Sequence, residues 1–106
     1  MLKTLTLPIK RKWFDMIKSG KKREEYREIK PHWERRLINN GKLREFDQVL
    51  FINGYRSDSE RLLVQCTGIG VGTGEMDWGA EQGSIYFIIE LGNILPLPTH
   101  SIQPKK

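Results

Sequence analysis

The chain has 106 residues, 38% of them hydrophobic, a length that predicts one domain built around one core. It contains no apolar run near the roughly 20 residues that a membrane helix needs, and residues 1–7 alternate without a cleavage site, so we expect neither a membrane span nor a signal peptide. The one cysteine, Cys66, excludes an internal disulfide and is expected to be buried in a strand, and together these features predict a cytoplasmic protein.

Positive charge is concentrated in the first part of the chain. The net charge is +5, but residues 1–44 hold fourteen Lys and Arg against five Asp and Glu, whereas residues 45–106 hold four against eight. A one-sided positive field attracts polyanions and steers their approach. The asymmetry makes a nucleic acid or a nucleotide a candidate partner, with solvated helix surface as the alternative for any single lysine.

The chain begins with a predicted strand and a short helix. Residues 2–7 alternate and are rich in strand formers, and Pro8 is expected to end that strand. From Lys10 the pattern changes to one apolar stripe of helical spacing, read as core and formed by Ile9, Trp13, Phe14, Met16 and Ile17. Gly20 is expected to end this helix as a left-handed C-cap.

A charged strand and a second short helix follow. Residues 23–29 form the strand, with Tyr26 at its centre. Pro31 opens the second helix, because its fixed φ suits the first helical position, and residues 39–41 (Asn-Asn-Gly) are expected to close it.

The second half of the chain reads as three strands and a tail. Residues 47–52 and 61–67 are predicted to pair as a hairpin with a loop of five to seven residues that contains Asn-Gly. Residues 85–91 are the most apolar strand and are expected to be central. We therefore predict an α+β fold over residues 1–92, a curled mixed sheet approaching a small β-barrel with two short helices, and a poorly ordered, Pro-containing tail over residues 93–106.

Several familiar chemistries find no support in the sequence. The alternating glycines of residues 68–74 lack the third glycine of a dinucleotide fingerprint and the Gly-Lys-Ser/Thr of a phosphate loop. They predict instead a sharp strand bend, or a close approach of another group to the backbone. His32 and His100 have no cysteines or clustered acids at ligand spacing, and no serine lies in a nucleophile elbow. We expect neither a metal nor a cofactor.

The most informative stretch is residues 20–27, where a helix end, a tight turn and a charged strand fall within eight residues. Side chains alternate along a strand, so Arg23, Glu25 and Arg27 are expected to share one face. Charges on an inward face need partners or water. The alternative is a surface ladder of ion pairs, worth ~0–1 kcal/mol per pair.

The pattern Gly20-x-Lys22-x-x-Glu25-x-Arg27, placed directly after the helix of residues 13–19, resembles the G-x-K-x-x-E-x-R signature of ASCH domains. The resemblance extends from the first strand at residue 5 to the closing strand at residue 91. It implies a PUA-like β-barrel with a cleft lined by the signature residues and an RNA- or nucleotide-related role. Some small relatives in this family remove the acetyl group from N4-acetylcytidine, and ribonuclease activity has been ascribed to others.

The resemblance also implies catalytic candidates. In the amidohydrolase type the catalytic lysine matches Lys22, whereas the threonine three places later is replaced here by Glu25. The third catalytic member, a glutamate before the last strand, would be Glu81, with Glu75 as the rival. A lysine base needs its pKa lowered from about 10.4 toward 7–8, equivalent to ~3.5–5 kcal/mol, and a neighbouring Glu25 opposes that shift.

For binding, Lys22 and Arg27 are expected to contact phosphate. The basic residues that would extend this path are Lys10, Arg11, Lys12, Lys21 and Arg23. Glu25 could accept from a base amino group, and Trp78 could stack on a base or anchor its loop in the core. Three functions remain open: a binding module for RNA, nucleosides or nucleotides, which we prefer, a small hydrolase acting on a modified nucleoside or on RNA, and a protein-interaction domain.

Overall fold

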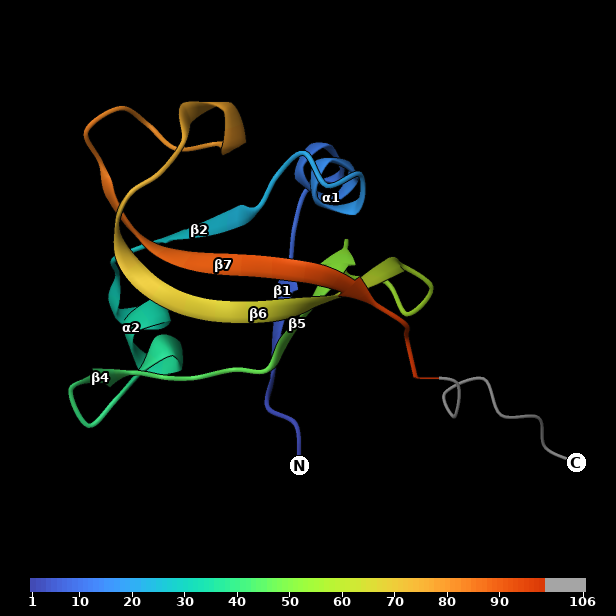
Figure 1. Cartoon of the computed structure of the whole chain (residues 1–106), viewed down its shortest axis with the longest axis horizontal. Helices are drawn as coiled ribbons and strands as arrows, with labels where there is room; N and C mark the ends of the chain where they lie inside the picture. The colour runs from blue at the N-terminus through green and yellow to red at the C-terminus, as the bar shows by residue number, and fades with distance from the viewer. Residues whose placement is uncertain (99–106) are drawn as a thin grey trace, which may run out of the picture.

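The structure is a computed structural model that describes residues 1–98; the predicted tail from residue 99 onward, with His100, lies outside the described residues. A five-stranded mixed sheet forms its body, and its strands lie in the order β1 (Thr4–Pro8), β5 (Gln48–Asn53), β6 (Glu60–Thr73), β7 (Ile85–Leu95) and β2 (Glu24–Glu28). The pair β1–β5 is parallel and the other neighbours are antiparallel. The sheet is curled, with helix α1 (Arg11–Lys18) seen above β6 and β7 in Figure 1 and helix α2 (Pro31–Leu37) seen below them. The predicted α+β fold with a curled sheet and two helices is confirmed.

The curl is concentrated in the long strand β6. This strand runs for 14 residues and bends visibly in Figure 1. Its pairing with β7 shifts register between Val64 and Cys66 and again between Cys66 and Gly68, just before the alternating glycines. Beyond the end of the strand, a Cβ on Gly74 would lie 2.6 Å from Cζ of the Tyr26 ring. The glycine run therefore serves both predicted purposes, a bend and a close approach.

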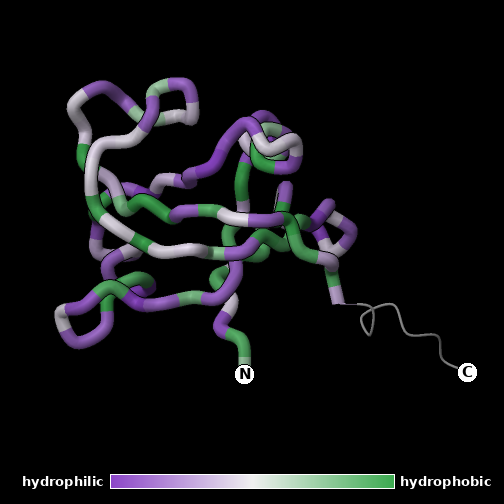
Figure 2. Tube along the Cα trace, in the orientation of Figure 1, coloured by the Kyte–Doolittle hydropathy of each residue, from purple (hydrophilic) through white to green (hydrophobic). Residues whose placement is uncertain are grey.

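The core lies between the concave side of the sheet and the two helices. Six of its residues have no exposed surface: Leu7, Phe14, Leu37, Val49, Phe51 and Ile89. Helix α1 contributes Phe14 and Ile17, whereas Trp13 from the predicted stripe is only partly buried and packs against the edge of the core. Figure 2 shows the hydrophobic segments along the middle strands and hydrophilic segments in the loops. Removing a buried phenylalanine such as Phe14 costs ~3–5 kcal/mol.

Two arginines bridge the open seam of the barrel. Strands β1 and β2 are the two edges of the sheet, and neither has a further strand partner among the described residues. Arg27 of β2 donates from Nη2 to the carbonyl oxygen of Pro8 at 3.1 Å, and Arg36 of α2 donates to the carbonyl oxygen of Thr6 at 3.2 Å. These bonds satisfy carbonyls on the outer side of β1, and they tie β2 and α2 to it. Pro8 lies within β1, which an edge strand tolerates.

Two predicted boundaries are wrong. Asn40 and Gly41 do not close α2; they form the turn of a small hairpin between β3 (Ile38–Asn39) and β4 (Lys42–Leu43), with φ of 54° and 76°. Positive φ at both positions is what a tight hairpin turn requires. Strand β7 continues to Leu95, which pairs with Leu63, so the described part of the chain stays ordered in the sheet past residue 92.

Three other expectations for the second half are confirmed. Strands β5 and β6 pair as the predicted hairpin around residues 54–59, and β7 lies inside the sheet between β6 and β2. Cys66 is buried, with 8% of its surface exposed. A short 3-10 helix, η1 (Met76–Trp78), lies in the loop between β6 and β7. Within residues 1–98, the helices lack the length and apolar character needed to cross a membrane.

Candidate functional site

The site begins where helix α1 ends. Gly20 has a φ of +84° and, as predicted, terminates the helix in the left-handed conformation. The backbone N–H groups of Lys21 and Lys22 both donate to the carbonyl oxygen of Met16, at 2.9 and 3.0 Å. This tight turn reverses the chain and directs Lys22 into the interior two residues before β2 begins.

Lys22, Glu25 and Arg27 converge, as the sequence predicted. Lys22 Nζ lies 3.2 Å from Glu25 Oε1, and Arg27 Nη1 donates to Glu25 Oε2. Only 1% of the Lys22 side chain, 7% of the Glu25 side chain and 14% of the Arg27 side chain are exposed. The cluster is therefore a buried ionic network and not a surface ladder. Arg23, expected on the same face, is instead exposed.

The side chain of Lys22 is almost completely buried, with 1% of its surface exposed. Its Nζ donates to the carbonyl oxygen of Trp78 at 2.6 Å, and it lies 5.1 Å from the Trp13 ring and 4.8 Å from the Tyr26 ring. Burial lowers the pKa of Lys22, and the charge of Glu25 acts in the opposite direction. Lys22 therefore supports the residues of the site but does not itself line the open cavity.

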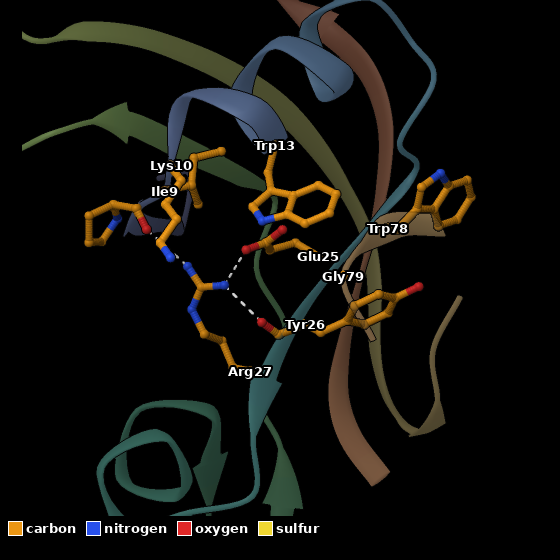
Figure 3. Close-up of a pocket in the computed structure, with 9 residues that line it drawn as sticks. Ile9, Lys10, Trp13, Glu25, Tyr26, Arg27, Trp78 and Gly79 are labelled. Atoms are coloured by element: carbon orange, nitrogen blue, oxygen red, sulfur yellow. Dashed lines mark hydrogen bonds and ion pairs between the residues drawn. The ribbon is translucent and has the colours of Figure 1, made fainter. Parts of the chain in front are cut away.

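The cavity beside this cluster has a volume of about 250 Å³. It is open to solvent, and the residues that line it are Pro8, Ile9, Lys10, Trp13, Glu25, Tyr26, Arg27, Trp78 and Gly79. In Figure 3 the carboxylate of Glu25 and the guanidinium of Arg27 point toward each other beside the Trp13 ring, with Lys10 at one end and Trp78 at the other. The cleft thus combines the indole wall of Trp13 with a carboxylate and a guanidinium, and Trp78 lies at its edge.

Arg27 is held by the protein on several sides. It donates to the carbonyl oxygens of Tyr26 at 2.8 Å and Pro8 at 3.1 Å, and its guanidinium lies 5.1 Å from the Trp33 ring. Such contacts fix the orientation of the guanidinium, and through it the orientation of the Glu25 carboxylate. The pair is therefore pre-organised before any ligand arrives.

Tyr26 fastens the loop of residues 74–84 to the sheet. Its hydroxyl donates to Glu24 Oε1 at 2.7 Å and accepts from the Glu75 N–H at 2.8 Å, and burial raises its pKa. In the same loop Gly79 has a φ of +104°, and a Cβ there would lie 3.1 Å from the Trp13 ring. The loop is packed against Trp13, which places Trp78 at the cleft.

The other predicted basic residues divide into two groups. Arg11 is committed to ion pairs with Asp15 and Glu60, each at 3.0 Å. Lys12 lies 4.7 Å above the Trp13 ring, and Lys10 lines the cavity. Lys21 and Arg23 are exposed beyond the other end of α1 and do not line the cavity. The continuous basic path that we expected along the chain is thus divided between the two ends of the helix.

The structure does not bring the predicted third catalytic residue to Lys22. Glu81 is exposed and lines a separate pocket of about 530 Å³, which meets the cleft at Gly79. Glu75 is also exposed, and it contributes its backbone N–H to Tyr26. Trp78 lines the cavity, and its backbone carbonyl anchors Lys22, whereas its indole points away from Glu25 in Figure 3.

Trp13 and Tyr26 are the site residues that sequence reasoning missed. The helical spacing predicts that Trp13 lies in the core, and strand alternation predicts that Tyr26 faces away from Glu25. A tryptophan at the border of an apolar stripe, next to three consecutive basic residues, is the signal that could have identified the first. No group of three or more potential metal ligands occurs within residues 1–98.

The chain matches no protein-family profile, no curated protein and no solved structure. A functional assignment depends on the chemistry of the cleft itself.

Proposed function

We propose that this protein is an ASCH-type domain that binds RNA or nucleotides, with a PUA-like barrel as its scaffold and one base seated in the cleft between Trp13 and Trp78. The observation that carries the proposal is the Glu25 carboxylate, held nearly buried by Arg27 and Lys22 yet lining an open cavity beside the Trp13 indole, with Trp78 at the cavity's edge. A carboxylate accepts hydrogen bonds from an exocyclic base amino group, as from N4 of cytosine. An aromatic wall supports base stacking worth ~1–3 kcal/mol per base.

The charge of the site is consistent with a nucleotide and unfavourable for an unpaired anion deep inside. The cations Lys22 and Arg27 are already balanced in part by Glu25, so the floor of the cleft suits a polar, uncharged group such as a base edge. Phosphate is better accommodated at the mouth, where Lys10 lines the cavity. This differs from our expectation that Lys22 itself contacts phosphate.

Hydrolysis of a modified nucleoside is the second candidate. It is favoured by the lowered pKa of Lys22, which moves this amine toward the neutral form that a general base requires. Three observations favour binding over it: Lys22 does not line the cavity, the position that would carry the nucleophilic hydroxyl is Glu25, and Glu81 lies in another pocket. We therefore expect no release of acetate from N4-acetylcytidine.

The test is a titration of the purified protein with cytidine, followed by tryptophan fluorescence and by calorimetry. We expect saturable binding that weakens by about 10- to 100-fold in Glu25→Gln, because hydrogen bonds to a charged group contribute ~1.5–3 kcal/mol. Trp78→Ala provides a second variant if Glu25→Gln lowers stability too far. Glu45→Gln, an exposed glutamate that does not line the cleft, is the matched control.

Two results would contradict the proposal. One is the absence of binding to cytidine, to the other nucleosides and to short single-stranded RNA. The other is robust deacetylation of N4-acetylcytidine, followed by chromatography, that disappears in Lys22→Ala; that result would establish the hydrolase instead.

A further inference from the structure

The two ends of the cleft carry opposite charge. Lys10 lines the cavity at the end where α1 begins, and Lys12 Nζ lies 4.7 Å from the ring of Trp13, which lines the same cavity. Figure 3 shows Lys10 and Trp78 at opposite ends of the cavity. Trp78 belongs to the loop of residues 74–84, which contains three acidic residues and no Lys or Arg.

The positive charge at the α1 end is available for a ligand. Within residues 1–98, neither Lys10 nor Lys12 forms an ion pair or a hydrogen bond through its side chain. By contrast, Arg11 and Lys18 on the same helix are both paired with Glu60, at 3.0 and 2.9 Å. Lys10, which lines the cleft, and Lys12, which lies over the Trp13 ring, therefore carry positive charge that no acidic side chain among the described residues balances.

The loop end is acidic, and so is the surface beyond it. Glu75, Asp77 and Glu81 are exposed and make no ion pair within the described residues. Past Gly79 the neighbouring pocket is lined by Glu28 and Glu81, and its lysine, Lys30, is already paired with Glu28 at 3.0 Å. A phosphate that left the cleft in this direction would meet net negative charge.

From this asymmetry we infer that the cleft selects a nucleoside carrying a single flanking phosphate, free or at the end of a strand, with that phosphate against Lys10 and Lys12. A phosphate monoester carries a charge of about −1.5 to −2 at pH 7 and suits two free ammonium groups. A nucleotide inside a strand has a phosphate on each side, and one of them would have to cross the acidic loop. This inference rests on the proposed function and specifies its ligand.

The experiment compares cytidine, its 5′- and 3′-monophosphates, the dinucleotides ApC and CpA, and the trinucleotide ApCpA by calorimetry at low salt. We expect one monophosphate to bind about tenfold more tightly than cytidine, and ApCpA to bind more weakly than that monophosphate. The preferred isomer shows which side of the nucleoside carries the phosphate. If the matching dinucleotide binds as well as the monophosphate, the site accepts strand ends; if it binds more weakly, the site takes the free nucleotide.

Two double variants, each of which removes two positive charges, test where the phosphate binds. Lys10→Ala/Lys12→Ala should abolish the preference for the monophosphate over cytidine. Arg35→Ala/Lys42→Ala removes two exposed cations from α2 and β4, away from the cleft, and should preserve that preference. Neutralising the loop with Glu75→Gln/Asp77→Asn/Glu81→Gln should strengthen ApCpA binding more than monophosphate binding.

The possible outcomes distinguish a failure of this inference from a failure of the proposed function. Equal affinity for cytidine and both monophosphates, or tightest binding of ApCpA by the wild type, overturns the inference while base recognition stands. A preference that survives in Lys10→Ala/Lys12→Ala also overturns it. If none of these compounds binds, the proposed function fails and the inference fails with it.

Discussion

Replacing Glu25 by glutamine tests how much the buried ionic network contributes to the free energy of unfolding. The substitution removes the charge that both Lys22 and Arg27 face, and leaves two cations in surroundings where at most 14% of a side chain is exposed. Removing one partner of a buried ion pair costs ~3–5 kcal/mol. Since domains of this kind are stable by only ~5–15 kcal/mol, the loss should be large and easily measured by urea denaturation.

The loss should also depend on pH. The pKa of Lys22 in the folded protein lies below its ordinary value of 10.5 because burial outweighs Glu25, and removing Glu25 should lower that pKa further. Between the folded pKa and 10.5 the unfolded chain binds more protons than the folded one, so stability rises with pH across that window. Glu25→Gln should extend this pH range to lower pH, and the variant should regain stability as the pH is raised toward 10.

The controls separate charge from packing. Lys22→Met in the Glu25→Gln background removes the uncompensated ammonium, so the double variant should be more stable than Glu25→Gln alone. Glu45→Gln, exposed and distant from the network, should stay within about 0.5 kcal/mol of the wild type. A cost below about 1 kcal/mol for Glu25→Gln at pH 7, or a pH dependence identical to that of the wild type, would refute the reasoning.

Three further predictions concern the scaffold around the site. Gly74→Ala should destabilise the protein by ~1–3 kcal/mol, because the new Cβ would lie 2.6 Å from the Tyr26 ring. The control Gly70→Ala, whose Cβ would have no atom within 4 Å, should be tolerated, and equal melting temperatures for the two variants would contradict this prediction. Arg27→Met should open the β1–β2 seam and speed amide exchange at Ile9 by about tenfold or more, and unchanged protection would argue against the bridging role. Burial raises the pKa of the Cys66 thiol, so alkylation of Cys66 at pH 8 should be much slower in the native protein than in the protein unfolded in urea. Equal alkylation rates would show that the thiol is accessible in the native protein.

Local signals were sufficient to predict most of the elements. The proline at the start of α2, the glycine after α1 and the Asn-Gly turn before β6 each fix backbone geometry within a few residues. The error at the end of α2 occurred where two local signals conflicted. Asn40-Gly41 is compatible with a helix end and with a hairpin turn, and the choice depends on whether Ile38 and Leu43 can pair, which is decided by tertiary packing.

The site was predictable only in part, because local sequence patterns do not show which distant segments pack together. Lys22, Glu25 and Arg27 lie within one turn and one strand, so short-range geometry brings them together. The loop that carries Trp78 reaches Lys22 from 56 positions away, and no local pattern predicts that its carbonyl accepts from Lys22 Nζ. The separation of free from paired lysines likewise depends on Glu60, which lies on another strand.

The most direct test of the central claim is an NMR titration of the three tryptophan indole N–H groups with the cytidine monophosphates. Trp13 and Trp78 line the cavity, whereas Trp33 packs against the core and does not line it. The account predicts that the indole signals of Trp13 and Trp78 shift in a saturable way with one common dissociation constant, and that the Trp33 signal moves least. Absence of any saturable shift at Trp13 and Trp78, or a dominant shift at Trp33 alone, would contradict it.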